Sequence, residues 1–190
     1  MVFFGNMAKR AFDIVAAFAA TVVFLVPWII IAVIIKIQSP GPAIYKPVRV
    51  GKNGKPFTLY KFRSMRVDCG AIHATTLRGD SRIFPFGAFL RKTSLDELPQ
   101  FWNILRGEMA LIGPRPIVPE EVSYYGDDYS TFASVKPGVT GLWQVSGRSD
   151  LGYEERVGLD VFYVNNWSFW MDCFIFFRTF FVIIMGRGAY

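Results

Sequence analysis

The chain has 190 residues, enough for one domain with a modest core. Its hydrophobic fraction of 52% and its 19 phenylalanines predict apolar surface that faces something other than water. Lysine and arginine number 21 against 15 acids, and the formal charge of +6 suits nucleic acid, anionic lipid or a phosphorylated substrate. A single histidine sets aside Ser-His-Asp and multi-histidine metal chemistry, and two distant cysteines set aside a disulfide framework or zinc knuckle.

The first predicted element is a long apolar helix over residues 7–36. Over 14–35 only Thr21 and Pro27 interrupt the apolar run, which as a straight helix would be about 33 Å long, close to the thickness of a hydrocarbon core. Pro27 removes a helical hydrogen bond and should kink the segment. Basic residues flank both ends, which the positive-inside preference meets best if both ends stay on one side. The residues alone leave two alternatives, a spanning helix and a re-entrant one.

Residues 39–62 predict a β-hairpin. The segment Ser-Pro-Gly-Pro at 39–42 ends the helix, because proline cannot continue it. Two β-like runs follow over 43–50 and 57–62, and the residues at 51–55 between them have the composition of a turn. The glycines of this turn lack the Lys-Ser/Thr pair and the helix of a P-loop, so a phosphate-cradling role is not expected.

After the hairpin, residues 65–81 are polar and irregular and predict a loop. Three short helices are expected beyond it, over 98–105, 120–125 and 153–165. The C-terminal stretch over 167–185 alternates bulky apolar residues with charges, and its apolar part is too short and too charged to span a bilayer. An amphipathic helix at an interface, with Arg178 reaching toward headgroups, is favoured over a buried core helix.

The run Leu-Arg-Lys-Thr-Ser-Leu-Asp-Glu-Leu-Pro-Gln at 90–100 is the best candidate for chemistry. It sets Asp96 and Glu97 side by side a few residues after two cations. One acid could hold a divalent metal while the other attacks an anionic substrate. The alternative is a capping box, in which Glu97 only closes a helix that starts after Ser94. If the helix instead begins at Pro99, both carboxylates lie at its entrance, where the helix dipole stabilises them.

Four further cations are candidate anion ligands. Lys61 and Arg63 alternate at a predicted strand end, and Arg115 is held between two prolines in a stiff turn, where its guanidinium suits bidentate phosphate recognition. Arg148 follows in another turn-rich loop. Each of them alone is more simply a structural or solvated cation. Several phosphate-competent cations around one acid pair nevertheless predict a phosphate-handling site.

Six blocks in a fixed order carry a resemblance to a known family. They are Lys-Arg-Ala-Phe-Asp at 9–13, Ser-Pro-Gly-Pro at 39–42, Lys-Phe-Arg-Ser-Met at 61–65, the run at 90–100, Gly-Pro-Arg-Pro at 113–116 and Lys-Pro-Gly-Val-Thr-Gly-Leu-Trp-Gln-Val-Ser-Gly-Arg at 136–148. Through them the chain resembles the bacterial monotopic phosphoglycosyl transferases from Ala8 to its C-terminus. The last block and the Gly-Ala-Tyr ending are most similar to the undecaprenyl-phosphate hexose-phosphate transferases that initiate exopolysaccharide, capsule and O-antigen synthesis.

The resemblance implies transfer of hexose-1-phosphate from a UDP-sugar, with UDP-galactose or UDP-glucose expected, to undecaprenyl phosphate with release of UMP. Asp96 would be the nucleophile of a covalent phosphosugar–aspartyl intermediate, and Glu97 would bind Mg²⁺. Lys61, Arg91 and Arg115 would neutralise phosphate charge, and Arg148 would contact the nucleotide sugar. The cations expected to bind substrate are Lys61, Arg63, Arg91, Arg115 and Arg148.

The implied fold class is α+β, with a re-entrant membrane helix over 1–38 broken at Pro27. A cytosolic catalytic domain over 39–190 would hold the hairpin, the short helices and a C-terminal interfacial helix. The expected location is the cytoplasmic face of the bacterial inner membrane with monotopic topology, as a minimal catalytic unit without the additional N-terminal helices of larger members. Pro47 in place of a usual Gln and a short loop over 67–78 depart from the family pattern, and the loop could affect sugar choice.

Two other classes of function stay open from the residues. The +6 charge also suits a membrane-bound module that binds anionic ligands without catalysis. No aromatic–basic RNA-binding signature is present, so no nucleic-acid partner is expected. A non-catalytic scaffold is the second alternative, and the intact Asp96–Glu97 pair argues against it. The transferred sugar and the oligomeric state stay open, with a homodimer among the alternatives.

Overall fold

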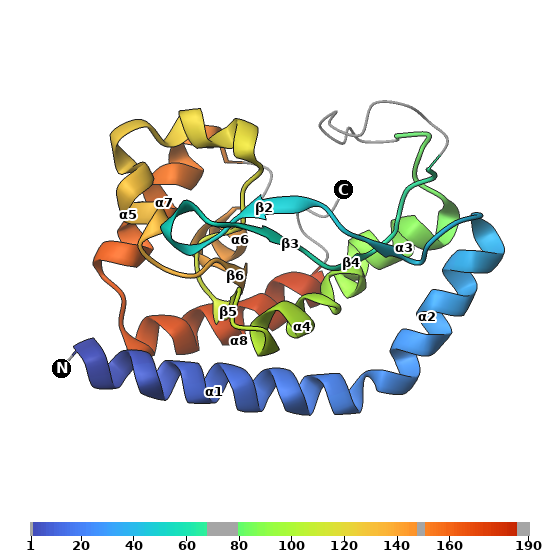
Figure 1. Cartoon of the computed structure of the whole chain (residues 1–190), viewed down its shortest axis with the longest axis horizontal. Helices are drawn as coiled ribbons and strands as arrows, with labels where there is room; N and C mark the ends of the chain where they lie inside the picture. Colours follow the sequence, from blue (N-terminus) through green and yellow to red (C-terminus); the bar gives the residue numbers. More distant parts are fainter. Residues whose placement is uncertain (1, 68–79, 148–150, 186–190) are drawn as a thin grey trace.

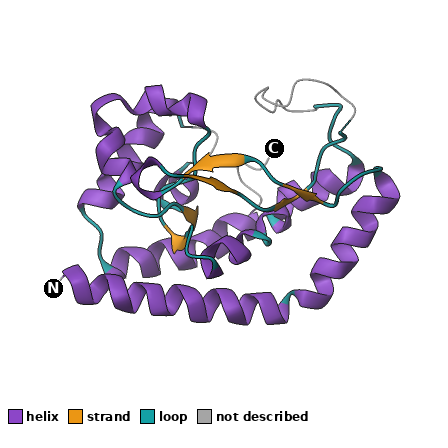
Figure 2. Cartoon of the chain, viewed as in Figure 1, coloured by secondary structure: helices purple, strands orange, loops and turns teal. Residues whose placement is uncertain are grey.

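The computed structural model describes residues 2–67, 80–147 and 151–185. Helices dominate, and the strands form small pairs, as the predicted α+β class requires (Figure 2). The helices are α1 (Val2–Val23), α2 (Leu25–Gln38), α3 (Pro85–Thr93), α4 (Gln100–Leu105), α5 (Tyr129–Ala133), α6 (Leu142–Ser146), α7 (Tyr153–Asn165) and α8 (Phe169–Met185). The 3₁₀ turns are η1 (Lys52–Gly54), η2 (Leu95–Glu97) and η3 (Pro119–Asp128).

The N-terminal helices α1 and α2 are two arms bent by 60° (Figure 1). The break lies at Phe24, whose backbone (φ −91°, ψ 5°) leaves the helical range. Pro27 follows three residues later, and because proline has no N–H, the carbonyl of Val23 loses its helical partner there. The predicted break is therefore confirmed, one turn before the proline. In the described ranges, neither arm alone is long and apolar enough to cross a bilayer, and only the bent pair taken together is.

The strands form three separate two-stranded pairs. They are β1 (Ile44–Tyr45) with β4 (Lys61–Phe62), β2 (Val48–Val50) with β3 (Pro56–Thr58), and β5 (Ala110–Ile112) with β6 (Gly138–Thr140). The first two pairs are antiparallel and share the turn η1, so the predicted hairpin is confirmed. The left-handed backbone of Asn53 (φ 58°) and Gly54 (φ 72°) closes that turn. The third pair is parallel and joins segments 28 residues apart, which no local sequence pattern predicted.

Polar contacts at the start of the chain tie α1 to the globular part. The Arg10 guanidinium donates to the carbonyl of Ile104 at 2.8 Å, and the buried Asp13 carboxylate accepts the backbone N–H of Leu111 at 3.1 Å. Figure 1 accordingly shows α1 along the base of the molecule, with α4 and α8 lying over it. The main core fills the space between these helices and the β5–β6 pair, around Ile104, Met109 and Ile175.

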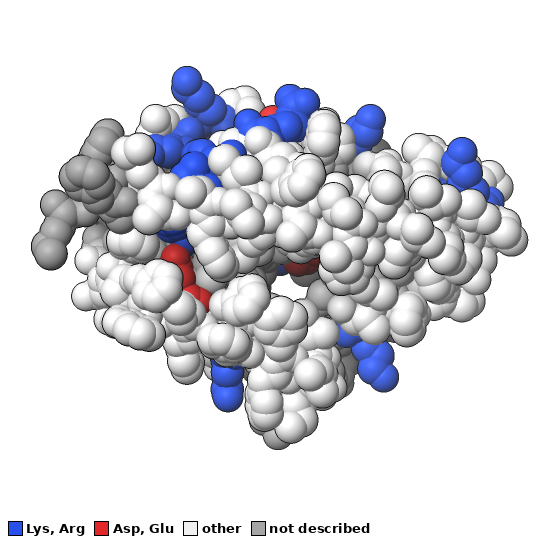
Figure 3. Space-filling model, turned by 90° about the horizontal axis from the view of Figure 1, so that it is seen from below, with Lys and Arg blue, Asp and Glu red and all other residues white. Residues whose placement is uncertain are grey.

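A broad apolar surface remains on the outer sides of α1, α2 and α8. Figure 3, seen from the α1 side, shows a mostly uncharged face with lysines and arginines gathered toward its rim. On α8, Ile175 is buried in the core, whereas Trp170, Phe177 and Ile184 are exposed. Only one face of α8 therefore packs on the protein, which excludes the alternative of a buried core helix.

Candidate active site

The two adjacent carboxylates lie in a tight connection between α3 and α4. Ser94 ends α3 in a left-handed conformation (φ 57°), and its N–H bonds to the carbonyl of Arg91 at 3.2 Å. A non-glycine residue there stores strain of about 1 kcal/mol. The chain then forms η2, which carries Asp96 and Glu97, and α4 begins after Pro99. The Ser94 side chain makes no capping hydrogen bond, so the capping-box alternative is wrong.

Lys61 of β4 brings positive charge to both acids. Its ammonium lies 2.8 Å from Glu97 Oε1 and 3.7 Å from Asp96 Oδ2, and Arg115 Nη1 lies 3.5 Å from the same Glu97 oxygen. Asp96 is only 7% exposed, and burial raises the pKa of its carboxyl group, with Lys61 opposing that rise. The site thus holds one buried carboxylate behind one ion-paired carboxylate.

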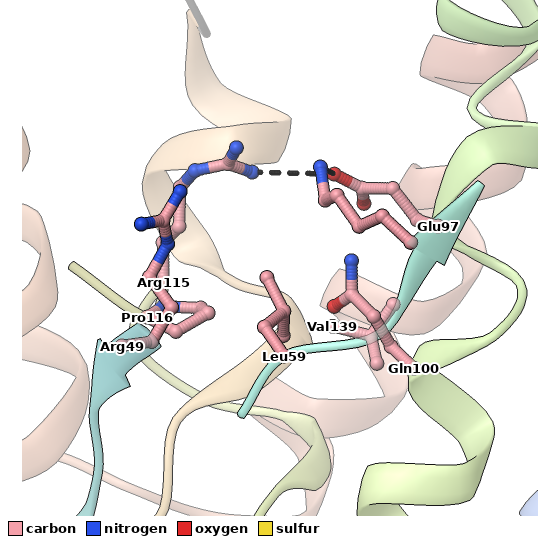
Figure 4. A pocket seen from close by; sticks show the side chains of 8 residues that line it. Arg49, Leu59, Glu97, Gln100, Arg115, Pro116 and Val139 are labelled. Atoms are coloured by element: carbon pink, nitrogen blue, oxygen red, sulfur yellow. Dashed lines mark hydrogen bonds and ion pairs between the residues drawn. The ribbon is translucent and has the colours of Figure 1, made fainter. Parts of the chain in front are cut away.

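A polar pocket opens in front of this group (Figure 4). Its lining residues are Arg49, Leu59, Lys61, Glu97, Gln100, Arg115, Pro116 and Val139. Three of them are cations and one is an acid, so the pocket favours an anionic ligand. Asp96 does not line it and lies behind the Lys61–Glu97 pair.

Arg49 is the functional candidate that the sequence analysis missed. The signal was the alternation of the hairpin, because directly paired residues and residues two apart in a strand share a face. Arg49 pairs with Phe57, and the face that Phe57 begins continues through Leu59 to Lys61. All but Phe57 line the polar pocket.

The turn that carries Arg115 is built by close backbone packing. A Cβ on Gly138 would lie 2.1 Å from the backbone nitrogen of Gly113, so β6 meets the end of β5 without room for a side chain. The Arg115 guanidinium lies 5.9 Å from the ring centre of Trp143 in α6. On the other side, Val50 of β2 donates its N–H to Ile117 at 2.9 Å. These contacts hold Arg115 against the hairpin.

Helix α7 supports the same turn from below. The Tyr163 hydroxyl lies 3.2 Å from the carbonyl of Ile112, the last residue of β5. Asp160, 1% exposed, faces the backbone N–H of Arg115 and accepts the Tyr125 hydroxyl at 2.9 Å. Burial raises the pKa of Asp160 to about 7. A buried acid therefore lies directly behind an arginine of the pocket.

The structure brings only part of the predicted site together. Lys61 and Arg115 line the pocket with Glu97. Arg91 lies in the last turn of α3 and does not line the pocket, and its charge opposes the rise in the pKa of Asp96. Arg63 is buried elsewhere, and its guanidinium donates to the carbonyls of residues 39 and 40, which fixes the turn after α2. Arg148 lies outside the described residues.

The carboxylates at the pocket could bind a divalent cation only in part, because they are two in number. The described ranges contain no group of three or more histidines, cysteines and acids, so they offer no protein cage for a metal. Glu97 and Asp96 provide two neighbouring carboxylates, both within 4 Å of one ammonium. Mg²⁺ is typically bound by one or two carboxylates together with substrate phosphates. The residues present therefore fit Mg²⁺ that arrives with a phosphorylated ligand.

A second, apolar cavity of about 320 Å³ lies on the side of strand β4 opposite the polar pocket. Its lining residues are Leu25, Trp28, Ile29, Ala32, Ile44, Tyr60, Phe62, Pro99 and Trp102. Tyr60 and Phe62 face this cavity, while Lys61 between them faces the polar pocket. One strand thus separates a cationic pocket from an apolar cavity.

Comparisons with known proteins identify a family model and several relatives that match this chain. The family model of the bacterial sugar transferases matches residues 4–186. The chain is 43% identical over 198 residues to the UDP-galactose-lipid carrier transferase of Erwinia amylovora and to the undecaprenyl-phosphate galactose phosphotransferase of Salmonella typhimurium, covering 96% of this chain and 41% of each relative. It is 40% identical over 202 residues to the exopolysaccharide production protein ExoY of Rhizobium meliloti, covering 98% of this chain and 89% of ExoY. The chain therefore spans about two fifths of the first two relatives and most of the third.

Proposed function

The chain belongs to the bacterial sugar transferase family, and on that basis we propose that it transfers hexose-1-phosphate from UDP-galactose or UDP-glucose to undecaprenyl phosphate. The observation that carries this proposal is the buried Asp96 behind Glu97, Lys61 and Arg115, beside a pocket for anions. Displacement at phosphorus by a carboxylate needs no histidine, and it does need cations that shield the phosphate charge.

In the first step, a carboxylate oxygen of Asp96 attacks the β-phosphorus of the UDP-sugar. The bond from that phosphorus to the bridging oxygen breaks, and UMP leaves with the electron pair. The product on the protein is a phosphosugar–aspartyl anhydride. Because Lys61 and Glu97 lie in front of Asp96, their ion pair must open as the diphosphate enters, and Lys61 then pairs with phosphate.

In the second step, a phosphate oxygen of undecaprenyl phosphate attacks the same phosphorus. The aspartyl–phosphorus bond breaks, which frees the Asp96 carboxylate and forms undecaprenyl-diphosphate hexose. Glu97 would hold Mg²⁺ here, and the bound ion would neutralise charge on the diphosphate. Lys61 and Arg115 supply the fixed positive charge of the site.

The acceptor is a lipid, and two apolar features support its access. The apolar cavity is lined by Pro99, two residues after Glu97, and by Leu25 and Trp28 of α2. The exposed apolar face of α1, α2 and α8 would place this cavity at the lipid boundary. We therefore place the protein on the cytoplasmic face of the bacterial inner membrane, with the bent α1–α2 pair entering and returning on one side. There it would initiate exopolysaccharide, capsule or O-antigen synthesis.

The test is UMP release by detergent-purified protein with undecaprenyl phosphate and Mg²⁺ across a panel of UDP-hexoses. We expect release with one donor and its loss in Asp96→Asn, and Glu97→Gln should raise the Mg²⁺ concentration that is required. Asp127→Asn, at an exposed carboxylate of η3, is the matched control and should keep full activity. Unchanged UMP release by Asp96→Asn would rule out the nucleophile, and no release with any donor would rule out the activity.

A further inference from the structure

We propose that Arg49 is a donor-binding residue that forms, with Arg115, a two-guanidinium clamp for the phosphate that leaves with the nucleotide. This inference rests on the proposed function, because it takes a nucleotide diphosphate as the ligand of the polar pocket. It assigns a role to a strand arginine that lies outside the acid pair and its salt bridges.

Among the described residues, Arg49 forms no ion pair within 4 Å, and Glu120 and Glu121 act on its charge from farther away. Other described cations do form such pairs. Lys61 and Arg115 pair with Glu97, Lys9 pairs with an acid on α8, and both Arg82 and Arg106 pair with acids two residues away. The hydrogen bond that the Arg49 guanidinium donates goes to the carbonyl of the preceding Val48, at 3.1 Å. A half-buried guanidinium without a carboxylate is poised for an anion from outside.

Arg49 also lies close to a second positive charge, that of Arg115. Arg49 and Arg115 line the same pocket, and Figure 4 shows their guanidiniums on one wall. Burial and the neighbouring Arg115 lower the pKa of Arg49, which means that the two charges repel one another in the unliganded protein. An anion between them would relieve that repulsion, and it would add to the contact that Arg115 already makes with Glu97 at 3.5 Å.

A backbone hydrogen bond fixes the distance between the two segments that carry Arg49 and Arg115. The bond from the N–H of Val50 to the carbonyl of Ile117 joins the strand of Arg49 to the segment of Arg115. Neither guanidinium therefore depends on a long flexible loop for its position.

The charged side chains are arranged across the pocket in an order that suits a diphosphate. Figure 4 shows Glu97 across the pocket from the two arginines, with Leu59 between them. The Lys61 ammonium lies 2.8 Å from Glu97 Oε1 and therefore belongs to the Glu97 side. A diphosphate laid across the pocket would have one phosphorus near Lys61 and Asp96, where the displacement takes place. Its other phosphate would then lie at Arg49 and Arg115. That second phosphate is the one that leaves as UMP.

The experiment compares Arg49→Gln and Arg49→Lys with wild type in the UMP-release assay. Losing one charge-assisted bond to phosphate should raise the KM for the UDP-sugar about ten- to a hundredfold. The inhibition constant of UMP should rise by the same factor, while the KM for undecaprenyl phosphate should change less than twofold. Lysine keeps the charge and loses the bidentate geometry, so it should give a smaller shift. Arg106→Gln, which removes a half-exposed and ion-paired guanidinium, should leave all three constants unchanged.

The outcomes separate this inference from the proposed function. If wild type turns over and Arg49→Gln binds donor and UMP normally, the clamp is wrong. A shift confined to the KM for undecaprenyl phosphate would also overturn it, because the clamp would then hold the lipid phosphate. If wild type turns over no UDP-sugar, the proposed function fails, and UMP binding by calorimetry still tests the clamp through its weakening in Arg49→Gln and Arg49→Lys. Thermal melts of both variants establish that they are folded.

Discussion

Buried carboxylates occur on both sides of the polar pocket, and they differ in what surrounds them. Asp96 has Lys61 at 3.7 Å, so positive charge opposes the effect of its burial. Asp160 has a hydroxyl partner in Tyr125, and both the charge and the backbone N–H of Arg115 oppose the rise in its pKa. Burial is the largest influence on the pKa of both carboxyl groups and raises both values, and Asp96 differs in having an ammonium group within 4 Å.

Asp160 gives a pH dependence with a definite sign. Its pKa is about 7 in the folded protein and 3.8 when unperturbed, so the folded state binds a proton more tightly than the unfolded state between these values. The free energy of unfolding contributed by this group should fall as pH rises from about 4 to about 7 and level off above, by up to about 4 kcal/mol. Unfolding measured from pH 5 to pH 8 should show this slope.

Asp160→Asn keeps the shape without the titration and should flatten the slope. Asp127→Asn, at an exposed position, should leave it unchanged. An identical slope in Asp160→Asn and wild type would assign the effect to other buried groups.

At the scale of elements, the parallel β5–β6 pair positions Arg115 through glycines rather than through side chains. Gly138 and Gly141 both approach the backbone of Gly113, so closely that a Cβ would lie 2.1 Å and 2.3 Å from its atoms. Each strand has only three residues, and its stability depends on this contact. The position of Arg115 in the pocket should therefore be sensitive to a single methyl group added at one of these glycines.

Two glycine-to-alanine changes test this packing against each other. Gly138→Ala should destabilise the protein by at least about 2 kcal/mol, because the methyl group meets backbone that cannot move aside. Gly158→Ala, within α7 where nothing lies within 4 Å of the new Cβ, should stabilise by about 1 kcal/mol through helix propensity. Denaturant unfolding measures both, and equal effects of the two changes would contradict the packing argument.

Local patterns predicted the elements whose signal lies within a few residues. The helix over 153–165 and the hairpin around η1 are where they were expected, and the helix predicted over 98–105 is α4, which begins two residues later. The β5–β6 pair was missed, because three-residue strands have no periodicity and their pairing is a long-range contact. The prolines and glycines of the turns carried most of the usable signal.

The site was predictable to the extent that its residues are adjacent in sequence. The Asp96–Glu97 pair stands out by itself, and the face of Arg49 could have been found from strand alternation. Nothing in the Lys-Phe-Arg pattern distinguishes Lys61 from Arg63. In the structure Lys61 lines the pocket, whereas Arg63 donates hydrogen bonds to backbone carbonyls after α2. That difference depends on how strand β4 meets α2, which only the tertiary structure reveals.

The whole molecule is asymmetric in polarity. The exposed apolar residues of α1, α2 and α8 lie on one side, while the turn η3 with its acids lies at the opposite end (Figure 1). Lys9 of α1 pairs with Asp172 of α8, and the Asp172 carboxylate also accepts the indole N–H of Trp167 at 3.0 Å. These contacts hold the two helices together and so fix the apolar sides of α1 and α8 relative to one another.

This face predicts binding to lipid vesicles. Phe177→Glu replaces an exposed ring on α8 and should weaken vesicle partitioning more than tenfold, because a buried phenylalanine contributes roughly 2–3 kcal/mol. Tyr124→Glu, at an exposed aromatic residue of η3, is the control and should leave partitioning unchanged. Vesicle flotation measures both, and equal losses would show that the face is not the contact surface.

Residues 60–62, which include strand β4, separate a polar from an apolar environment. Lys61 faces the cationic pocket, and Tyr60 and Phe62 face the apolar cavity, so a single step along the backbone passes from an aqueous to an oily environment. A water-soluble donor and an oil-soluble acceptor could then reach the same carboxylate from opposite directions. The donor would not need to enter the lipid, and the acceptor would not need to enter water. The two half-reactions of the proposed transfer could then alternate while the protein stays at the membrane surface.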